Sequence, residues 1–507
     1  MRRYFMGIDI GTTGGRACVF DDEGNLIGRA YQEYPCHYPE EGFVEQYAAE
    51  LLPALYQTSR EAIAASGISA DTIEAVALST PGPVLCLLDE NFELMTPLIG
   101  WQDLRGAAYM GKAAEAIGDV NAYYEETGAP FTASNPVGKL LWLKNERSKE
   151  WKECAYIATA TEYFNKKFGA WECVTDPTMA SRMMIMDIHN GCFSKAIIEK
   201  LGIEEKKLAK IVPCGEIIGE ITEELSKLTG LAVGTKLVMG ALDQNTSTLG
   251  LGMLIAGQAG FKLGTAGLLT TVIEKPKFHD KGMLIVKPNA CVGDYTLEGI
   301  SFSSASAYRW YRDTFCQTEK DAADKLGIST YDIMNQLARK SKPGACGVTF
   351  LNYLQGAAGV VHNYQAQGTF TGLTFGTTKS DITRAVMEGI VYEEKTMLDA
   401  MYEMGIPITE MRLSGGGANS RTWAQMHADI LEVPIVLLQT SELSALGASM
   451  LAGIGVGVYS DIQDAVEKCI HIEKTYMPNK KLKTAYEKAY QKYMNCYETM
   501  SKGNVWA

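Results

Sequence analysis

The sequence lacks the patterns that mark several common classes of protein. Its twelve cysteines never form a C-x-x-C pair, which argues against a zinc ribbon and a thioredoxin-type site. We expect free, mostly buried thiols in a reducing compartment. No run approaches the roughly 20 apolar residues of a membrane helix. The apolar run near the N-terminus ends at Asp9, too early for a signal peptide. We therefore expect a cytoplasmic protein that is neither secreted nor inserted in a membrane.

Positive charge is also in short supply. Lysine and arginine number 47 against 60 acidic residues, which gives a formal net charge of −13. Such a surface repels nucleic-acid phosphates and acidic membranes at long range, so we predict neither as a partner. An anionic ligand such as ATP would need local positive groups, a bound cation or backbone amides.

What the chain does contain is ample material for folding. Apolar residues make up 46% of the 507 residues and charged residues 21%, an ordinary globular balance. A chain of this length exceeds one ordinary core, so we expect at least two domains.

The first half alternates between strand and helix patterns. Strands are predicted at 4–10, 17–21 and 26–34, linked by a Gly-Thr-Thr-Gly turn and by the hairpin turn at 21–25. A helical pattern follows at 47–65, then strands at 73–79 and 84–89, and amphipathic helices at 140–146 and 196–202. This succession indicates the α/β class.

The second half partly repeats the opening of the chain. A strand at 236–242 ends before Asp243, and residues 258–275 again read as strand, Gly-Thr-Ala-Gly turn and strand. The echo suggests two related halves with a seam near residue 245, which we divide into domains 1–247 and 248–507. Further patterns predict strands from 411 and at 433–439, and helices at 422–431, 444–457 and 480–501; the last is expected to be exposed.

Two glycine-containing turns are candidate phosphate loops. The first contains Gly11, Thr12 and Thr13 with Arg16 nearby, and the second contains Gly264 and Thr265. Glycine lets backbone amides approach a phosphate closely, and the threonines add hydroxyl donors. Either motif alone also fits a plain turn, but together they could hold one polyphosphate from two sides.

A third glycine turn is a candidate nucleoside site. Gly415, Gly416 and Gly417 follow a predicted strand, and Asn419 precedes a predicted helix. A surface free of side chains can accommodate a purine or a ribose, and a helix N-terminus favours an anion. The alternative is a tight strand-to-helix turn.

Two aspartates end predicted strands. Asp243, with Gln244 after it, is placed to act as the general base that removes a proton from an attacking hydroxyl. Asp9 could hold a magnesium ion through its water shell. The residues alone leave open that Asp243 is a helix cap and that Asp9 belongs to a hairpin.

Other polar residues could contact a polyol. Glu45 accepts hydrogen bonds, as does Asp103, while the Trp101 face could cover the apolar edge of a sugar and Arg105 lies close in sequence. A surface salt-bridge turn explains the same residues equally well.

Taken in order, these segments resemble the FGGY family of carbohydrate kinases from Gly7 to about Gly457. The resembling segments are GIDIGTTGGR, GFVEQ, GWQDLR, PVGKLLWLK, TDPTMASR, GALDQ, KLGTAG, LSGGGANS and ALGASMLA. The resemblance implies two actin-like (ribonuclease H-like) domains with ATP in the cleft between them. It also implies Asp243 as the base, with Asp9 and Asp243 near Mg²⁺.

The resemblance leaves the substrate open. Family members usually carry a substrate-reading pair, Met-His in xylulokinases or Arg-Glu in glycerol kinases, where this chain has Thr80-Pro81-Gly82-Pro83. Gln244 follows the base as in glycerol kinases. Because few basic residues occur in the presumed sugar motifs, we expect a neutral or weakly acidic sugar, first a ketopentose such as xylulose. Another polyol, an aldonate or an autoinducer-2-like substrate remains an alternative, as does a non-catalytic actin-like ATPase. A homodimer is possible on this basis.

Overall fold

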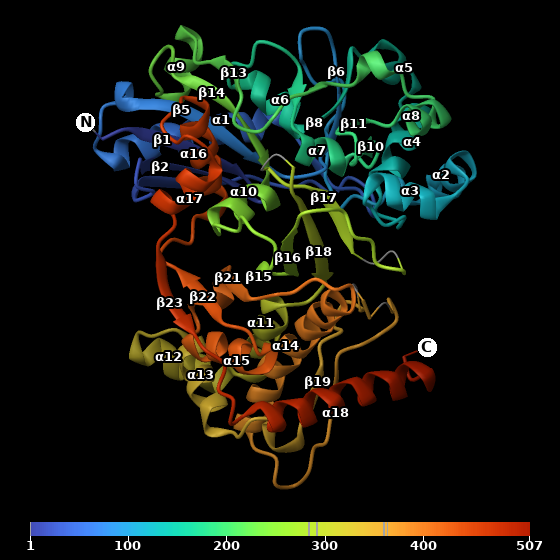
Figure 1. Ribbon diagram of the computed structural model, residues 1–507, viewed down its shortest axis with the longest axis vertical. Coiled ribbons are helices and arrows are strands. Elements are labelled where there is room, and N and C mark those ends of the chain that lie inside the picture. The colour runs from blue at the N-terminus through green and yellow to red at the C-terminus, as the bar shows by residue number, and fades with distance from the viewer. Residues whose placement is uncertain (1, 282–283, 291–292, 358–359, 362, 507) are drawn as a thin grey trace.

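The protein has two α/β domains, one above the other in the view of Figure 1. This computed structural model describes residues 2–281, 284–290, 293–357, 360–361 and 363–506. The α/β class and the two-domain arrangement expected from the sequence are confirmed. The division into 1–247 and 248–507 stays our proposal.

The first domain is built on a six-stranded sheet. Its order is β13-β14-β5-β1-β2-β3, with β1 parallel to β5, β5 parallel to β14, and antiparallel pairing of β1 with β2 and β2 with β3. The strands span Tyr4–Ile10 (β1), Gly14–Asp21 (β2), Leu26–Glu33 (β3), Ile73–Thr80 (β5), Ile217–Glu220 (β13) and Lys236–Leu242 (β14). The predicted strands and the hairpin turn therefore occur where the sequence placed them.

Both faces of this sheet are covered, which explains why β1 is apolar on both sides. Met6 and Ile8 pack with Leu55 of helix α1 (Ala48–Ser66) on one face. Phe5 packs on the other face with Ala445 of helix α16 (Leu443–Gly455). Asp9 is the polar exception at the end of the strand.

An outer layer extends the first domain. It holds a small sheet in the order β4-β7-β6-β8 and several short helices. Its elements are β4 (Glu45–Gln46), β6 (Leu85–Leu88), β7 (Leu98–Ile99), β8 (Tyr156–Thr159), α2 (Met110–Ile117), α3 (Val120–Thr127), α4 (Pro136–Glu146), α5 (Ser148–Glu153), α6 (Ala160–Lys167), α7 (Pro177–Arg182) and α8 (Lys195–Leu201). Helix α9 (Glu223–Thr229) instead lies beside α1.

The second domain repeats the strand order of the first. Its sheet runs β17-β18-β16-β15-β21-β22-β23, and β18-β16-β15-β21-β22 has the same parallel and antiparallel pairings as β3-β2-β1-β5-β14. The strands span Gln258–Leu263 (β15), Gly267–Ile273 (β16), Ile285–Pro288 (β17), Tyr295–Ser301 (β18), Glu410–Ser414 (β21), Ile435–Leu438 (β22) and Ile472–Tyr476 (β23). The weak sequence echo is therefore a repeat in three dimensions.

Helices surround this second sheet. The long helix α14 (Lys379–Glu403) is buried along most of its length and forms the centre of the core. The others are α11 (Ala305–Phe315), α12 (Gln317–Leu326), α13 (Thr330–Lys340), α15 (Arg421–Leu431) and α18 (Lys483–Lys502), with the short strands β19 (Thr349–Leu351) and β20 (Thr369–Thr371).

Helix α16 belongs to the second half of the chain but packs on the first sheet. Figure 1 shows α16 and α17 (Ile462–Cys469) in red beside the blue strands. Close approach depends on glycine: a Cβ at Gly7 would lie 1.9 Å from the Ala445 carbonyl oxygen. A Cβ at Gly447 would lie 1.9 Å from the Thr246 oxygen in α10 (Asp243–Gly250). The helix predicted at 444–457 is therefore α16, and it joins the two domains.

The predicted exposure of the tail helix is wrong in part. Tyr486 and Tyr493 of α18 are buried, and the Tyr493 hydroxyl donates to the Tyr353 hydroxyl at 2.9 Å. Tyrosine has an apolar ring with a polar tip, so a Lys- and Glu-rich helix can still pack through one face.

The expectation about thiols and membrane spans can also be checked on the described residues. No disulfide joins the cysteines there, and those at 18, 86, 154, 173, 316 and 469 are buried, whereas Cys192 and Cys346 are exposed. In the same part of the chain, no helix combines the length and apolarity needed to span a bilayer.

Candidate active site

Two carboxylates meet at one edge of the first sheet. Strands β1, β5 and β14 are parallel neighbours, so their carboxyl ends bring Asp9 and Asp243 to the same edge. The Ser79 hydroxyl donates to Asp9 Oδ1 at 2.9 Å. Asp243 is the first residue of α10, and its Oδ1 accepts the Gln244 amide at 2.8 Å. Leu242, not Asp243, holds the N-cap position of this helix.

Burial raises the pKa of both carboxyl groups, and the charge of Asp243 adds to the shift at Asp9. Burial and then the charge of Asp243 raise the pKa of Asp9 to about 6, against the opposing effects of Ser79 and Lys262. Burial also raises the pKa of Asp243, which Lys262 and Lys287 counteract. Because Lys262 lies in β15 of the second domain and lowers the pKa of both carboxyl groups, the pair faces both domains at the seam. A raised pKa suits a general base, and a close carboxylate pair suits a divalent cation.

The first predicted phosphate loop is a tight turn beside this pair. The Gly11 amide donates to the Gly14 oxygen at 3.0 Å, and the Thr12 carbonyl accepts Gln46 Nε2 at 2.9 Å. Thr13 is exposed. The turn therefore presents backbone and hydroxyl groups at the seam.

Arg16 has a partner that the sequence did not indicate. Its Nη1 lies 3.0 Å from Glu442 Oε2, and Glu442 also binds Arg29 at 2.9 Å. The guanidinium charge expected to serve a phosphate is therefore already paired with a carboxylate from the second half. It still lowers the pKa of Asp9.

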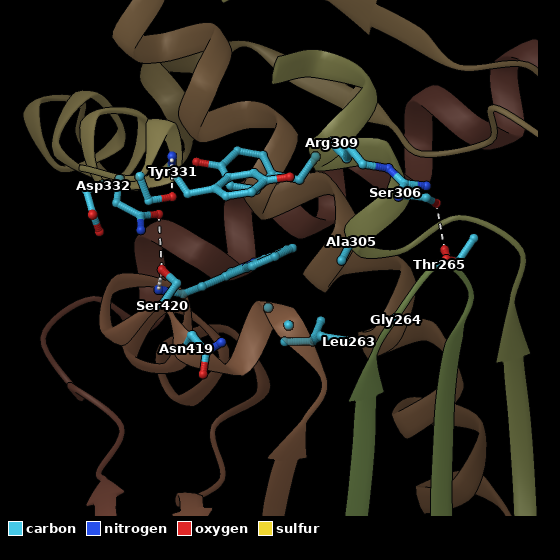
Figure 2. A pocket seen from close by; sticks show the side chains of 16 residues that line it. Leu263, Gly264, Thr265, Ala305, Ser306, Arg309, Tyr331, Asp332, Asn419 and Ser420 are labelled. Carbon is cyan, nitrogen blue, oxygen red and sulfur yellow. Dashed lines mark hydrogen bonds between the residues drawn. The ribbon is translucent and has the colours of Figure 1, made fainter. Parts of the chain in front are cut away.

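The second loop opens onto a cavity of about 540 Å³, within the usual size range of small-ligand sites. Figure 2 shows Thr265 and Ser306 at one end and Asp332, Asn419 and Ser420 at the other. The lining residues are Leu263, Gly264, Thr265, Ala305, Ser306, Tyr308, Arg309, Ser329, Tyr331, Asp332, Asn335, Gly416, Gly417, Asn419, Ser420 and Trp423. The cavity thus joins the second phosphate loop to the predicted nucleoside loop.

Gly415 differs from its neighbours in this loop. It does not line the cavity but precedes the short 3₁₀ turn Gly416–Asn419 (η5), with a φ of 81°. A Cβ there would lie 2.6 Å from the Leu263 oxygen. Gly415 therefore lets the two loops approach each other.

Sequence reasoning missed the aromatic walls of this cavity. Tyr308, Tyr331 and Trp423 stand close together, with ring centroids 5.5 Å apart for the tyrosines and 5.3 Å for Tyr308 and Trp423. In the sequence they occupy amphipathic helices, where aromatic residues usually form core.

A buried chain of hydrogen bonds supports the second loop from below. The Thr265 carbonyl accepts the Ser304 amide at 3.1 Å and the Ser306 hydroxyl at 2.6 Å. Asn352 Nδ2 donates to the Ser303 carbonyl and to Glu393 Oε2 of α14. Burial raises the pKa of Glu393 to about 8. The hydrogen bonds below the loop therefore lead to a carboxyl group whose pKa is raised by burial.

This carboxyl group makes stability depend on pH. Because the pKa of Glu393 rises from 4.5 to about 8 on folding, the carboxyl of the unfolded chain ionises through that window while the folded one stays protonated. The free energy of unfolding therefore falls as pH rises from about 4.5 to about 8. The loss reaches about 1.4 kcal/mol per pH unit. We expect Glu393→Gln to match the wild type in melting temperature at about pH 5 and to exceed it at about pH 8, as measured by calorimetry. Equal melting temperatures at both pH values would contradict this.

The residues expected to contact a polyol largely bind one another. Arg105 Nη2 lies 2.8 Å from Glu45 Oε1, and its Nε donates to Asp103 at 2.9 Å. Asp103 Oδ2 also accepts the Val44 amide at 2.6 Å. These charges are buried and compensated, so they shape the wall of the site. Their direct contact with substrate stays a prediction.

Trp101 and Thr80 are placed differently. Trp101 is 45% exposed, and its Nε1 donates to Thr12 Oγ1 at 3.3 Å, beside the first loop. Thr80 is buried at the end of β5, where its hydroxyl shares a hydrogen bond of 2.6 Å with Thr161. Trp101 is therefore the one of these two with a face open to solvent.

Three buried cations were not singled out from the sequence, and two of them, Arg182 and Lys287, lower the pKa of Asp243. Arg182 ends α7, and its Nε and Nη1 are buried without a hydrogen-bond partner among the described residues. Its charge lowers the pKa of Asp243, Lys139 and Lys287. The pKa of Lys139 and that of Lys287 are both lowered to about 8, and burial is the largest cause of each shift. These basic groups were not counted when the sequence favoured a neutral or weakly acidic sugar, and that preference stays a prediction.

The signal for these cations lay in segments already noted. Arg182 closes TDPTMASR, and Lys139 lies within PVGKLLWLK. Lys139 Nζ donates to the Gly100 and Trp101 carbonyls at 3.0 and 3.3 Å. Lys287 comes from β17 of the second domain and donates to Gln244 Oε1 at 2.7 Å. Only the fold brings the three together.

Comparison with known proteins agrees with this arrangement. Residues 4–250 match the N-terminal domain, and residues 259–456 the C-terminal domain, of the FGGY family of carbohydrate kinases. The chain is 31% identical to the gluconokinase of Bacillus subtilis over 93% of this chain and 91% of that protein. It is 26% identical to an autoinducer-2 kinase of Escherichia coli over 98% and 94%.

Solved structures match over nearly the full length. The ligand-bound xylulose kinase of Lactobacillus acidophilus has a TM-score of 0.89 at 25% identity, covering 98% of each chain. The gluconate kinase of the same organism has a TM-score of 0.89 at 25% identity, covering 99% of this chain and 98% of the other. The alternative of a non-catalytic actin-like ATPase is set aside by the family match. The chain belongs to the FGGY family of carbohydrate kinases and is an ATP-dependent sugar kinase.

Proposed function

We propose that this kinase transfers the γ-phosphate of ATP to a hydroxyl of a small sugar acid, an aldonate, with Asp243 as the general base. The observation that carries the proposal is the buried Arg182 guanidinium, which has unpaired N–H groups beside Asp243. Gluconate, the substrate in the names of two similar proteins, is an acid of this class.

A buried guanidinium without a partner is unfavourable until a ligand supplies one. A carboxylate fits best, because arginine can bind its two oxygens with parallel N–H donors. Lys139 adds a second positive charge that is electrostatically coupled to Arg182, whereas the charge of Lys287 is already paired with Glu298. A neutral ketose offers hydroxyl groups alone, so it would leave this charge uncompensated.

The residues at the seam support a division of labour. The cavity at the second loop would bind the nucleoside, and the loops at Gly11 and Gly264 would direct amides at the phosphates. Asp243 would accept the proton of the acceptor hydroxyl as the new bond to phosphorus forms.

Magnesium fits the same edge. Asp9 and Asp243 are two buried carboxyl groups, and burial followed by the charge of Asp243 raises the pKa of Asp9. In the described residues no cluster of three or more such ligands occurs, and Mg²⁺ is commonly held by one or two carboxylates with water and phosphate. Bound Mg²⁺ would neutralise charge on the phosphoryl oxygens. The cytoplasmic location and a homodimer remain predictions.

A ketopentose such as xylulose is the second candidate. The observation that favours it is the match to the xylulose kinase structure, which equals the gluconate kinase match in TM-score. A screen of ADP release with aldonates, ketopentoses and polyols tests both. We expect an aldonate to give the highest kcat/KM, whereas a preference for a neutral ketose would contradict our proposal.

Arg182 offers a sharper test. Arg182→Met removes charge-assisted hydrogen bonds, so we expect kcat/KM for the aldonate to fall about 10- to 100-fold and that for a neutral ketose to change much less. The control is Arg147→Met, because Arg147 is half exposed. An equal loss for all acceptors would assign Arg182 to the phosphoryl group and remove the main support for an acid.

A further inference from the structure

A hairpin of the second domain docks on the first domain beside the acceptor side of the seam. Figure 1 shows β17 and β18 reaching up to α7 and α3. The Val286 amide donates to the Gly128 carbonyl at 2.8 Å, and the Tyr124 hydroxyl donates to the Leu284 carbonyl at 2.6 Å. The Tyr295 hydroxyl also donates to the Ile188 carbonyl at 3.2 Å.

Gly128 makes this docking possible. It follows α3 with a φ of 70°, and a Cβ there would lie 1.9 Å from the Val286 oxygen. The clash would be with backbone, which cannot rotate away as a side chain can. Any larger residue at this position must push the hairpin outward.

The docked hairpin carries a buried lysine into the first domain. Lys287 is 1% exposed and pairs with Glu298 Oε1 of β18, also 1% exposed, at 2.5 Å. Its Nζ also donates to Gln244 Oε1 at 2.7 Å, and Asn245 Nδ2 donates to the neighbouring Pro288 carbonyl at 3.1 Å. A buried ion pair is weak support for stability on its own. Its position against the residue after the base points to a role at the site.

We propose that Lys287 is a positioning residue that the second domain supplies to the acceptor site. By holding Gln244 Oε1, it fixes the amide next to Asp243, so the acceptor site is complete only while the hairpin is docked. The inference rests on the proposed function in one respect, namely that the acceptor binds beside Asp243 and Gln244.

Removing the lysine tests this role. Lys287→Met alone would leave the buried Glu298 carboxylate without its ion-pair partner. The double variant Lys287→Met with Glu298→Gln is therefore the one that keeps the site neutral and folded. We expect its KM for the acceptor to rise about 10-fold or more, with the KM for ATP unchanged. Lys287→Arg should recover part of the loss, and Lys275→Met, at an exposed position, should resemble the wild type.

Undocking the hairpin provides a second test with a matched control. Gly67 ends α1 with φ 68° and ψ 8°, nearly the values of 70° and 7° at Gly128, and has nothing within 4 Å of a built Cβ. Both alanine variants therefore carry the same backbone strain. We expect only Gly128→Ala to raise the KM for the acceptor.

These comparisons separate this inference from the proposed function. The Lys287 and Gly128 variants are assayed with whichever acceptor the wild type phosphorylates. If that acceptor is a neutral sugar, the aldonate proposal is wrong, but the role of Lys287 can still be tested. Unchanged acceptor KM in the double variant, or equal behaviour of Gly128→Ala and Gly67→Ala, would overturn the role of Lys287. So would a parallel rise in the KM for ATP and for the acceptor, which marks a general structural effect.

Discussion

Replacing Asp243 with asparagine is expected to lower kcat by about 10²- to 10⁴-fold, the usual contribution of a general base. Asparagine retains the shape of the side chain and an oxygen for the Gln244 amide, but it cannot accept the proton of the acceptor hydroxyl. ATP binding should persist, because the cavity that we propose for the nucleoside is lined by residues of the second domain, from Leu263 to Trp423. Coupled ADP release and calorimetric titration with ATP measure the two effects separately.

A buried aspartate elsewhere provides the control. Burial also raises the pKa of Asp429, whose Oδ1 accepts the Asn479 amide at 2.9 Å in the second domain. Asp429→Asn makes the same replacement, of a buried aspartate by asparagine, as Asp243→Asn. We expect it to leave turnover unchanged. Wild-type turnover in Asp243→Asn would remove this residue from the mechanism.

Adding one methyl group at Gly447 is expected to destabilise the protein and reduce its activity together. A Cβ at this position would lie 1.9 Å from the Thr246 oxygen, and overpacking of this kind costs about 1–3 kcal/mol or more. Thr246 Oγ1 donates to Ser79 Oγ, which donates to Asp9, each at 2.9 Å. Displacement of α10 would therefore reach both carboxylates at the seam.

The control for this change is Gly111→Ala in α2. Gly111 also lies inside a helix, but nothing lies within 4 Å of a Cβ built there. Removing a glycine at an open helical position should stabilise by about 0.4–1 kcal/mol. Thermal melting and steady-state kinetics on both variants measure the effects on stability and on activity. If Gly447→Ala has the same melting temperature as Gly111→Ala, the contact between α10 and α16 is not tight.

Much of the fold could be predicted because its signals are local. The strands β1 to β3, their turns and helix α1 ending at Gly67 follow from short apolar runs and glycine positions. The partners of α16 could not be predicted, because Ala445 and Gly447 meet strands and helices hundreds of residues away. The same applies to the buried face of α18, which pattern alone assigned to solvent.

The candidate site divides in the same way. Asp9, Asp243 and the glycine loops stand at strand ends, a position that the sequence displays directly. Arg182 and Lys287 meet only after the two domains fold and the hairpin docks. Likewise, the ion pairs of Arg105 with Glu45 and of Arg16 with Glu442 join residues far apart in the sequence. Charge compensation depends on three-dimensional neighbours, which residue type does not specify.

A crystal structure of the Asp243→Asn enzyme tests the central claim most directly. The crystal would contain Mg²⁺, a non-hydrolysable ATP analogue and the acceptor that the wild type phosphorylates best. We predict that the side chain at position 243 lies within hydrogen-bond distance, about 2.6–3.2 Å, of the acceptor hydroxyl that faces the γ-phosphate. An acceptor bound away from residue 243, or a reacting hydroxyl held by a different carboxylate, would contradict the account.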